Sequence, residues 1–138
     1  MNEQDKQLLL KDLCARLPYE VKVKTFNNVA KVIGIVNRKG VKRATNYIDV
    51  LTNEQTYPIE YIRPYLRPMS SMTKEEIIEF NNIPSTKNYT IVKDDLPWDV
   101  SNHKQIGWLN AHHFDYRGLI EKGLALVAPD NMYSNESK

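Results

Sequence analysis

The sequence predicts an α+β protein: an N-terminal helix, a small antiparallel SH3-like β-barrel or curved meander, and C-terminal helices with one or two further short strands. Three observations predict this class. Leucines near the N-terminus recur at helical spacing, the next forty residues change to the period of two that is typical of strands, and helix-start signals return at residue 73. With 138 residues and 41% hydrophobic content, the chain fits a single domain, residues 1–138, with a buried core.

The first expected element is a helix from about Glu3 to Arg16. Asn2 can serve as its N-cap, and Pro18 stops it. Cys14 falls among the leucines of the apolar stripe, so we expect a buried and unreactive thiol. A chain with one cysteine has no internal disulfide, and its stability must come from packing, as a reducing compartment would favour.

Residues 19–59 form the β-rich part of the prediction. "YEVKVKTF" at 19–26 alternates between apolar and polar side chains, and "VAKVIGIV" at 29–36 is dense in β-branched residues. "NRKG" at 37–40 is expected to form a hairpin loop into "VKRATNYIDVLT", and the short strand "YPI" follows. Such tight connections predict an antiparallel meander that curls into a barrel or packs on the first helix.

A proline-rich connection at residues 58–72 separates the strands from the helical part. Pro58, Pro64 and Pro68 each lack a backbone N–H, so the connection is expected to contain neither a long helix nor a central strand. We expect a helical turn at residues 60–62 and then an extended segment.

Residues 73–123 are expected to be mainly helical. Thr73 and Glu76 have the spacing of a capping box, which predicts a helix that ends at Asn81. A second helix is expected from about His103 to His113. A third, short helix should follow, with its start and stop marked by a capping aspartate and a left-handed glycine.

That third helix is expected at Tyr116 to Lys122, between Asp115 as its N-cap and Gly123 as its stop. Two short strands are expected beside the helices, "NYTIVK" and "LALVAP", and Trp98 is expected to pack into the core. The polar tail at residues 129–138 should fray.

Two blocks of the sequence carry a family resemblance. "PYLRPMSSMT" at 64–73 and "WLNAHHFDYRGLIEKGLAL" at 108–126, in that order, resemble small uncharacterised proteins encoded in prophages and mobile elements of gut anaerobes. The blocks are long, unusual word matches and cover about a fifth of the chain. The resemblance implies a genomic setting. It implies no activity and carries over no catalytic residue.

The second block places His112, His113 and Asp115 close together, which raises a metal-assisted enzyme as one alternative. Adjacent histidines on a helix point about 100° apart, and a useful zinc site needs at least three protein ligands. A structural explanation uses Asp115 as a cap and leaves Arg117 exposed or paired with Glu121. We therefore expect no catalytic residue, no metal and no cofactor.

The formal charge of +2 is small, but its distribution is uneven. Residues 21–48 contain seven basic side chains and no acid, and Phe26 shares the exposed parity of Lys22 and Lys24. A basic face with an aromatic side chain is typical of barrels that bind single-stranded nucleic acid, although lysines also protect edge strands from aggregation. The candidate residues for a nucleic acid or another anionic partner are Lys22, Lys24, Phe26, Arg38, Lys39, Lys42 and Arg43.

Three functional classes follow from these observations. The sequence favours a non-catalytic interaction or structural module of a prophage or mobile element, with a protein as its partner. A nucleic-acid accessory protein is the second class, and the metal-assisted enzyme is the third. For the first class His113, Tyr116 and Arg117 are the expected protein contacts, on the condition that they are exposed.

The sequence also predicts a soluble, cytoplasmic protein. No apolar stretch approaches the roughly 20 residues that a membrane-spanning helix needs. The N-terminus "MNEQDKQLLLKDLCARL" has acids and a lysine before its leucines, unlike a secretory signal. We therefore expect no membrane partner. The oligomeric state does not follow from the sequence.

Overall fold

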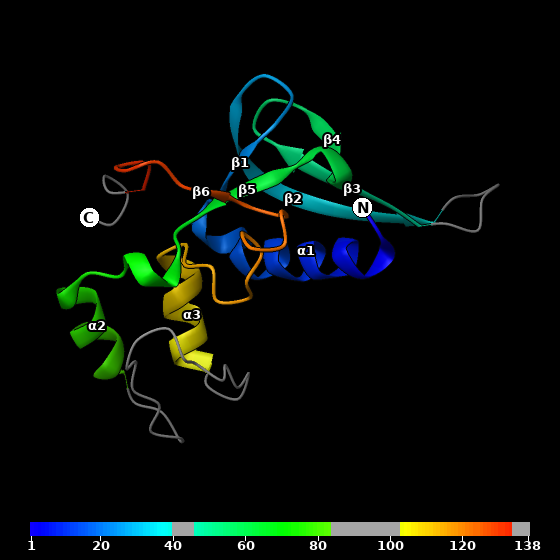
Figure 1. Ribbon diagram of the computed structural model, residues 1–138. Helices are drawn as coiled ribbons and strands as arrows, with labels where there is room; N and C mark the ends of the chain where they lie inside the picture. The colour runs from blue at the N-terminus through cyan, green and yellow to red at the C-terminus, as the bar shows by residue number, and fades with distance from the viewer. Residues whose placement is uncertain (40–45, 84–102, 134–138) are drawn as a thin grey trace.

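Figure 1 shows the computed structural model of the chain, which describes residues 1–39, 46–83 and 103–133. The elements combine an N-terminal helix, a sheet and two further helices, so the predicted α+β class is confirmed. In chain order they are α1 (Glu3–Arg16), η1 (Leu17–Tyr19), β1 (Lys22–Lys24), β2 (Val29–Lys39), β3 (Asn46–Thr52), β4 (Thr56–Pro58), η2 (Ile59–Tyr61), β5 (Arg63–Leu66), η3 (Met69–Ser71), α2 (Lys74–Asn81), α3 (His103–Ala111) and β6 (Leu126–Val127), where η marks a 3₁₀ helix.

The strands form one sheet in the order β4-β3-β2-β1-β5-β6. All neighbouring strands pair antiparallel except β5 and β6, which are parallel. The predicted meander is present, because β1 to β4 are neighbours both in sequence and in space. Among the described strands the sheet remains open, with β4 and β6 as its edges, so the structure does not show the closed SH3-like barrel.

β5 corrects the expectation that the proline-rich connection cannot supply a central strand. It lies between β1 and β6, and Pro64 pairs with Val23. Antiparallel pairs alternate between hydrogen-bonded and non-bonded positions. At the next position Lys22 N–H and Tyr65 C=O both point into the gap between the strands, where they meet the hydroxyl of Tyr133. Pro64 therefore occupies a non-bonded position towards β1, where its missing N–H costs no ladder bond.

α1 lies along one face of the sheet (Figure 1). Its predicted start and end are confirmed, and the Asn2 side chain accepts a hydrogen bond from the Asp5 N–H at 2.7 Å. Leu9 and Leu13 are completely buried and pack with strand residues in the larger hydrophobic cluster. Helix and sheet thus share a core.

The expectation of a buried Cys14 is wrong, because its side chain is exposed. The buried face of α1 consists of Leu9, Asp12, Leu13 and Arg16, and residue 14 lies about 100° from residue 13 around the helix. Desolvation by the neighbouring atoms raises the pKa of the Cys14 thiol, which keeps it protonated and weakly nucleophilic.

A second hydrophobic cluster lies between α2 and α3. Thr73 starts α2 with the predicted capping box: its hydroxyl accepts from the Glu76 N–H at 3.1 Å, and Glu76 Oε1 accepts from the Thr73 N–H at 3.0 Å. Phe80 of α2 and Leu109 of α3 are fully buried and pack with Phe114. The sheet and the C-terminal helices therefore have separate hydrophobic clusters.

The helix expected at residues 116–122 does not form. Gly118 adopts a left-handed φ of +75°, and the chain continues in turns up to Gly123, whose φ is +74°. Only glycine takes this conformation at low cost, and one such residue inside the segment interrupts a right-handed helix. Gly123 is left-handed as predicted. α3 ends at Ala111, ahead of the expected end, because His113 is itself left-handed, with φ of 64°.

The strand expected in "LALVAP" is confirmed as β6, which pairs with β5. The loop at residues 40–45, the expected strand "NYTIVK", Trp98 and the end of the tail lie outside the described residues. Within the described ranges, no helix has both the length and the apolar character needed to cross a bilayer.

Candidate functional site

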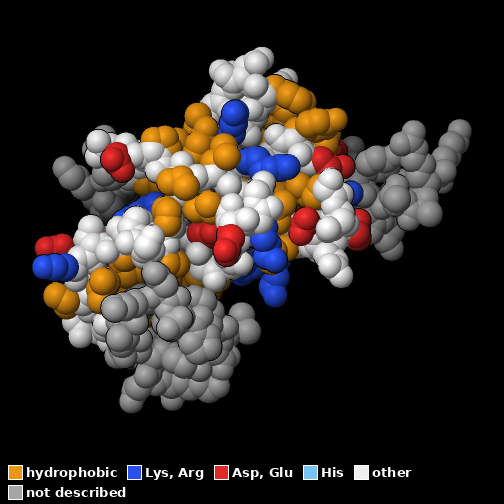
Figure 2. All heavy atoms as spheres, in the orientation of Figure 1, with side chains coloured by type: hydrophobic (Ala, Val, Ile, Leu, Met, Phe, Trp, Pro, Cys, Tyr) orange, Lys and Arg blue, Asp and Glu red, His pale blue; other side chains and the backbone are white. Residues whose placement is uncertain are grey.

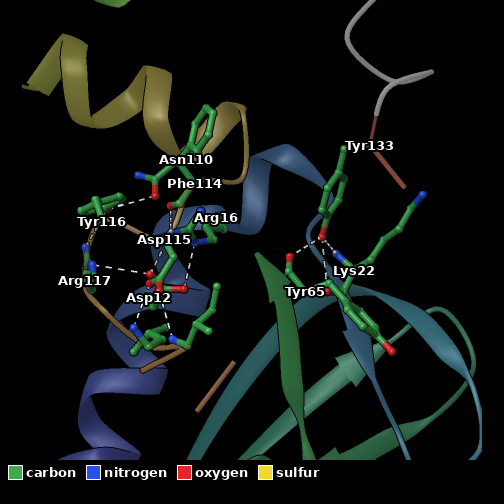
Figure 3. A network of polar contacts seen from close by, with 12 residues as sticks. Asp12, Arg16, Lys22, Tyr65, Asn110, Phe114, Asp115, Tyr116, Arg117 and Tyr133 are labelled. Carbon is green, nitrogen blue, oxygen red and sulfur yellow. Dashed lines mark hydrogen bonds and ion pairs between the residues drawn. The ribbon is translucent and has the colours of Figure 1, made fainter. Parts of the chain in front are cut away.

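Two regions contain the residues singled out by the sequence: the C-terminal block at 108–126 and the face of the sheet opposite α1. The C-terminal block is tied to α1 through Arg16, which also forms a buried ion pair within the helix (Figure 3). Arg16 Nε donates to Asp12 Oδ2 at 2.8 Å, and Arg16 Nη2 donates to Asp12 Oδ1 at 3.1 Å; both residues are 0% exposed. Arg16 Nη2 also donates to the Phe114 carbonyl at 2.7 Å. One arginine thus joins α1 to the end of the α3 region.

Arg117 extends this network and does not pair with Glu121 as the sequence suggested. Its Nε lies 3.5 Å from Asp12 Oδ1, and its Nη2 donates to the Tyr116 hydroxyl at 3.0 Å. That hydroxyl in turn donates to Asn110 Oδ1 at 2.9 Å. Without the expected helix, residues 117 and 121 do not share a helix face, which removes the reason for their pairing.

Asp115 is a cap, as predicted, but it caps turns. Its Oδ1 accepts from the Leu119 N–H at 2.8 Å, and its Oδ2 accepts from the Ile120 N–H at 2.9 Å. Both carboxylate oxygens are therefore used by backbone groups. The residue is 8% exposed and has a structural role.

The two histidines have separate environments. His112 stacks on Trp108, with 4.0 Å between ring centroids, and its Nδ1 lies 2.9 Å from the Trp108 carbonyl oxygen. His113 stacks on Tyr133 at 3.6 Å. Burial first, and then the positive charge of Arg16 and other cations, lowers the pKa of His113 to about 3, so its ring is neutral near pH 7.

The metal-assisted alternative gains no support from this arrangement. His112, His113 and Asp115 each have a different set of neighbours, and both carboxylate oxygens of Asp115 are occupied. Within residues 1–39, 46–83 and 103–133, no group of three or more His, Cys, Asp or Glu side chains could hold a metal ion.

The predicted protein contacts do not meet the condition of exposure. His113 is 5% exposed, Tyr116 is 9% exposed, and the Arg117 side chain is 13% exposed. Their polar groups serve the internal network in Figure 3 and the stack on Tyr133. The structure therefore offers no partner surface built from these three residues.

The opposite face of the sheet carries the basic residues predicted for β1. Strand pairing places Arg63 beside Lys24 and Lys31 beside Lys22, and paired residues in antiparallel strands point to the same face. Three adjacent strands therefore bring four basic side chains together. We call Lys22, Lys24, Lys31 and Arg63, with the aromatic residues Phe26 and Tyr61, the basic-aromatic face.

An exposed aromatic pair borders these basic residues. Phe26 and Tyr61 are 61% and 55% exposed, and their ring centroids lie 4.9 Å apart. Phe26 also makes an edge contact with the buried Tyr57, at 5.8 Å, which holds the ring at the end of the sheet. Figure 2 shows hydrophobic side chains at the top of the molecule, with Lys or Arg atoms next to them.

Several charges on this face are engaged within the chain. Lys22 Nζ donates to the Met132 carbonyl at 2.9 Å, and Lys31 Nζ lies 3.7 Å from a Glu20 carboxylate oxygen. Arg63 Nη1 donates to the carbonyls of Glu60 and Ile62. The Lys31–Glu20 pair is exposed and therefore weak, so it can yield to a phosphate, whereas the Lys22 contact is part-buried.

The side chains of the other four basic candidates are not described. Arg38 and Lys39 belong to β2, but only their backbone is described, and Lys42 and Arg43 lie outside the described residues. Their role in binding an anionic partner stays a prediction.

Tyr61 and Arg63 were not among the candidates that the sequence suggested. They follow the fourth strand and reach the basic-aromatic face only because β5 returns to pair with β1. A signal was present in the alternation of β5, where Pro64 and Leu66 are buried and Arg63 and Tyr65 are partly exposed. Three prolines in the connection obscured this period of two.

A groove of about 1280 Å³ lies beside the C-terminal block. One wall contains Arg67 and Glu76, which form a bidentate ion pair at 2.8 and 2.6 Å. Burial would raise the pKa of Glu76, but hydrogen bonds from Arg67 and Thr73 and the charge of Arg67 outweigh it, so the pKa is lowered. The far wall is the segment from Val127 to Tyr133.

Comparison of the chain with protein-family models, with curated proteins and with solved structures found no match.

Proposed function

We propose that this protein is a non-catalytic binding module that holds single-stranded nucleic acid on its basic-aromatic face. One observation carries the proposal: Phe26 and Tyr61 are exposed and in contact, directly beside Lys24 and Arg63. Aromatic rings stack on bases of any sequence, and nearby cations neutralise phosphates. A role as an accessory protein of a prophage or mobile element fits the same proposal and rests on the resemblance alone.

Single-stranded nucleic acid fits this face better than duplex. A stacking platform needs unpaired bases, which a duplex keeps stacked inside its helix. Phe26 lies in the turn between β1 and β2, and Tyr61 ends η2, so both rings stand at the rim of the sheet, where a flexible strand can reach them. A shallow pocket of about 270 Å³ lined by Lys24, Tyr61 and Arg63 adjoins the rings.

Fluorescence anisotropy with single- and double-stranded oligonucleotides tests the proposal. Four phosphate contacts on a single strand predict that log K falls with log salt with a slope of about −3. We expect binding at about 50 mM salt that weakens steeply at higher salt, with preference for the single strand. Absence of binding at low salt, or affinity that does not change with salt, would overturn the proposal.

Variants separate a functional face from a merely exposed one. Phe26→Ala should weaken binding roughly 5- to 150-fold, as expected for the loss of one stacked base. Ile78→Ala is the matched control, because Ile78 is 62% exposed, like Phe26, but lies on α2. Lys24→Glu should weaken binding and flatten the salt slope, whereas Lys122→Glu should do neither. Equal losses for test and control variants would contradict the proposal.

A triple variant measures how far the basic-aromatic face extends. It reverses the charges of Lys39, Lys42 and Arg43 at the end of the hairpin, where the side chains are not described. If these residues contact phosphates, the salt slope falls by about 2. An unchanged slope would restrict the face to the described residues.

A further inference from the structure

Tyr133 fills a slot between β1 and β5 (Figure 3). Its hydroxyl accepts a hydrogen bond from the Lys22 N–H at 3.0 Å and donates to the Tyr65 carbonyl at 2.7 Å. Lys22 and Tyr65 stand opposite each other in the register of the two strands, at a position where a ladder normally bonds directly. The tyrosine hydroxyl therefore bridges the two strands in place of a direct hydrogen bond.

The slot is complementary to a phenol. It offers one donor and one acceptor to a hydroxyl that can serve as both, and phenylalanine could satisfy neither. The ring stacks on His113 at 3.6 Å and 16°, with the Lys22 ammonium group 5.5 Å from its centroid. If the slot were empty, two part-buried backbone groups would lose this partner, and the hydroxyl of a ligand or a water molecule would have to replace it.

The segment that supplies Tyr133 is held by this side chain and by a hydrogen bond from Lys22 Nζ to the Met132 carbonyl at 2.9 Å. Tyr133 is 7% exposed, but Pro129, Asp130 and Asn131 before it are exposed. Asn131 has a left-handed φ of 70°, a conformation that asparagine adopts more readily than most residues. The segment also forms one wall of the large groove, so its departure would join slot and groove.

Tyr133 does not provide a hydrogen-bond partner for every polar atom around the slot. His113 Nδ1 is buried and has no hydrogen-bond partner among the described residues, although its ring forms the floor under Tyr133. The Arg67 N–H donates to the His113 carbonyl at 2.7 Å and holds this left-handed residue in place. A buried polar atom left unpaired next to a groove is a place for a ligand group.

We propose that the space between β1 and β5 is a tyrosine-binding slot, which Tyr133 fills from within the chain and which a tyrosine of an extended peptide from a partner protein fills when the segment withdraws. The groove beside the slot holds the residues that flank the incoming tyrosine. The slot shares Lys22 with the basic-aromatic face but uses neither Phe26 nor Tyr61, and the inference does not depend on nucleic-acid binding.

Full-length Tyr133→Ala protein, with the slot vacated, provides the test. The probes are a synthetic peptide of residues 129–135, "PDNMYSN", and the same peptide with phenylalanine in place of tyrosine, compared by isothermal titration calorimetry. We expect the tyrosine peptide to bind at least tenfold more tightly than the phenylalanine peptide, because only the hydroxyl meets Lys22 and Tyr65. Wild-type protein should bind the tyrosine peptide at least tenfold more weakly than the variant, because its own segment competes.

Equal affinity of the two peptides for the variant, or equal affinity of variant and wild type for the tyrosine peptide, would overturn the inference. If Tyr133→Ala does not fold, Tyr133→Phe replaces it: the ring stays, the hydroxyl is lost, and the tyrosine peptide should still bind more tightly than to wild type. NMR shifts of the Lys22 amide report occupancy of the slot directly. No nucleic acid enters this experiment, so its failure and that of the proposed function are separate results.

Discussion

The buried network around Asp12 and the basic-aromatic face use similar residue types in opposite ways. In the network, Arg16 and Arg117 share one carboxylate, and the tyrosine beside them uses its hydroxyl internally. On the face, Phe26 is 61% exposed, and Lys31 and Glu20 form an exposed pair. Arginine, lysine and aromatic residues thus build an internal network where they are buried and leave a basic and aromatic surface where they are exposed.

The two regions should respond differently to the loss of one charge. A buried charge without its partner carries a large desolvation cost, whereas exposed ion pairs contribute between zero and about 1 kcal/mol. Substitutions in the network should therefore change stability, and substitutions on the face should change binding. Three predictions, in order of decreasing effect on stability, test this contrast.

Asp12→Ala should give the largest loss, about 3–5 kcal/mol in the free energy of unfolding, because it leaves Arg16 buried without a carboxylate. Urea unfolding measures this loss. The double variant Asp12→Leu with Arg16→Met removes both charges and should recover much of it. A loss below about 1 kcal/mol for Asp12→Ala would mean that water reaches the pair and that the network resembles the surface.

Because of His113, the free energy of unfolding should decrease as the pH is lowered. Its folded pKa, about 3, lies below the ordinary histidine value, so between those values the unfolded chain binds a proton that the folded chain does not. This stability is complete above the unfolded pKa and declines as the pH falls towards 3. We expect a loss of about 2 kcal/mol between pH 7 and pH 5, measured by urea unfolding.

His113→Asn is the control for the pH prediction, because asparagine tolerates the left-handed φ of 64° and does not titrate in this range. Its unfolding free energy should change less between pH 7 and pH 5. The lowered pKa of Glu76 acts in the same direction, but only at more acidic pH. An identical pH dependence in the variant would show that His113 is not the group responsible.

Lys24→Glu should have the smallest effect, within about 0.5 kcal/mol of wild-type stability, because the side chain is exposed. Thermal unfolding measures it, and the oligonucleotide titrations described above supply the contrasting readout. A large destabilisation together with unchanged binding would reverse the comparison and assign the face a structural role.

Local patterns in the sequence predicted the elements well where local physics decides them. The Asn2 cap, the capping box of Thr73 and Glu76, and the left-handed Gly123 all depend on neighbouring residues, and all are present. The alternation in β1 also predicted that Val23 is buried on the face opposite to Lys22 and Lys24. The prediction failed at Cys14, where a difference of one position around the helix decides burial.

The candidate sites could be predicted only in part. Lys22, Lys24 and Phe26 follow from the alternation along one strand, but Tyr61 and Arg63 join them through pairing between β1 and β5. Arg117 was expected to be exposed or paired four residues along a helix, but it reaches a carboxylate on α1. Neither the spacing of residues in the sequence nor the composition predicts these contacts between distant segments.

The sequence by itself determined the class of fold, the starts and ends of α1 and α2, and the concentration of basic residues between positions 21 and 48. Only the tertiary structure decided that His113 and Asp115 are buried, that Tyr133 replaces a bond between two strands, and that two aromatic rings meet at the rim of the sheet. The physical reason is the distance along the chain between the residues that interact. Caps, turns and alternation act over a few residues, whereas burial and ion pairing depend on segments that meet only when the chain has folded.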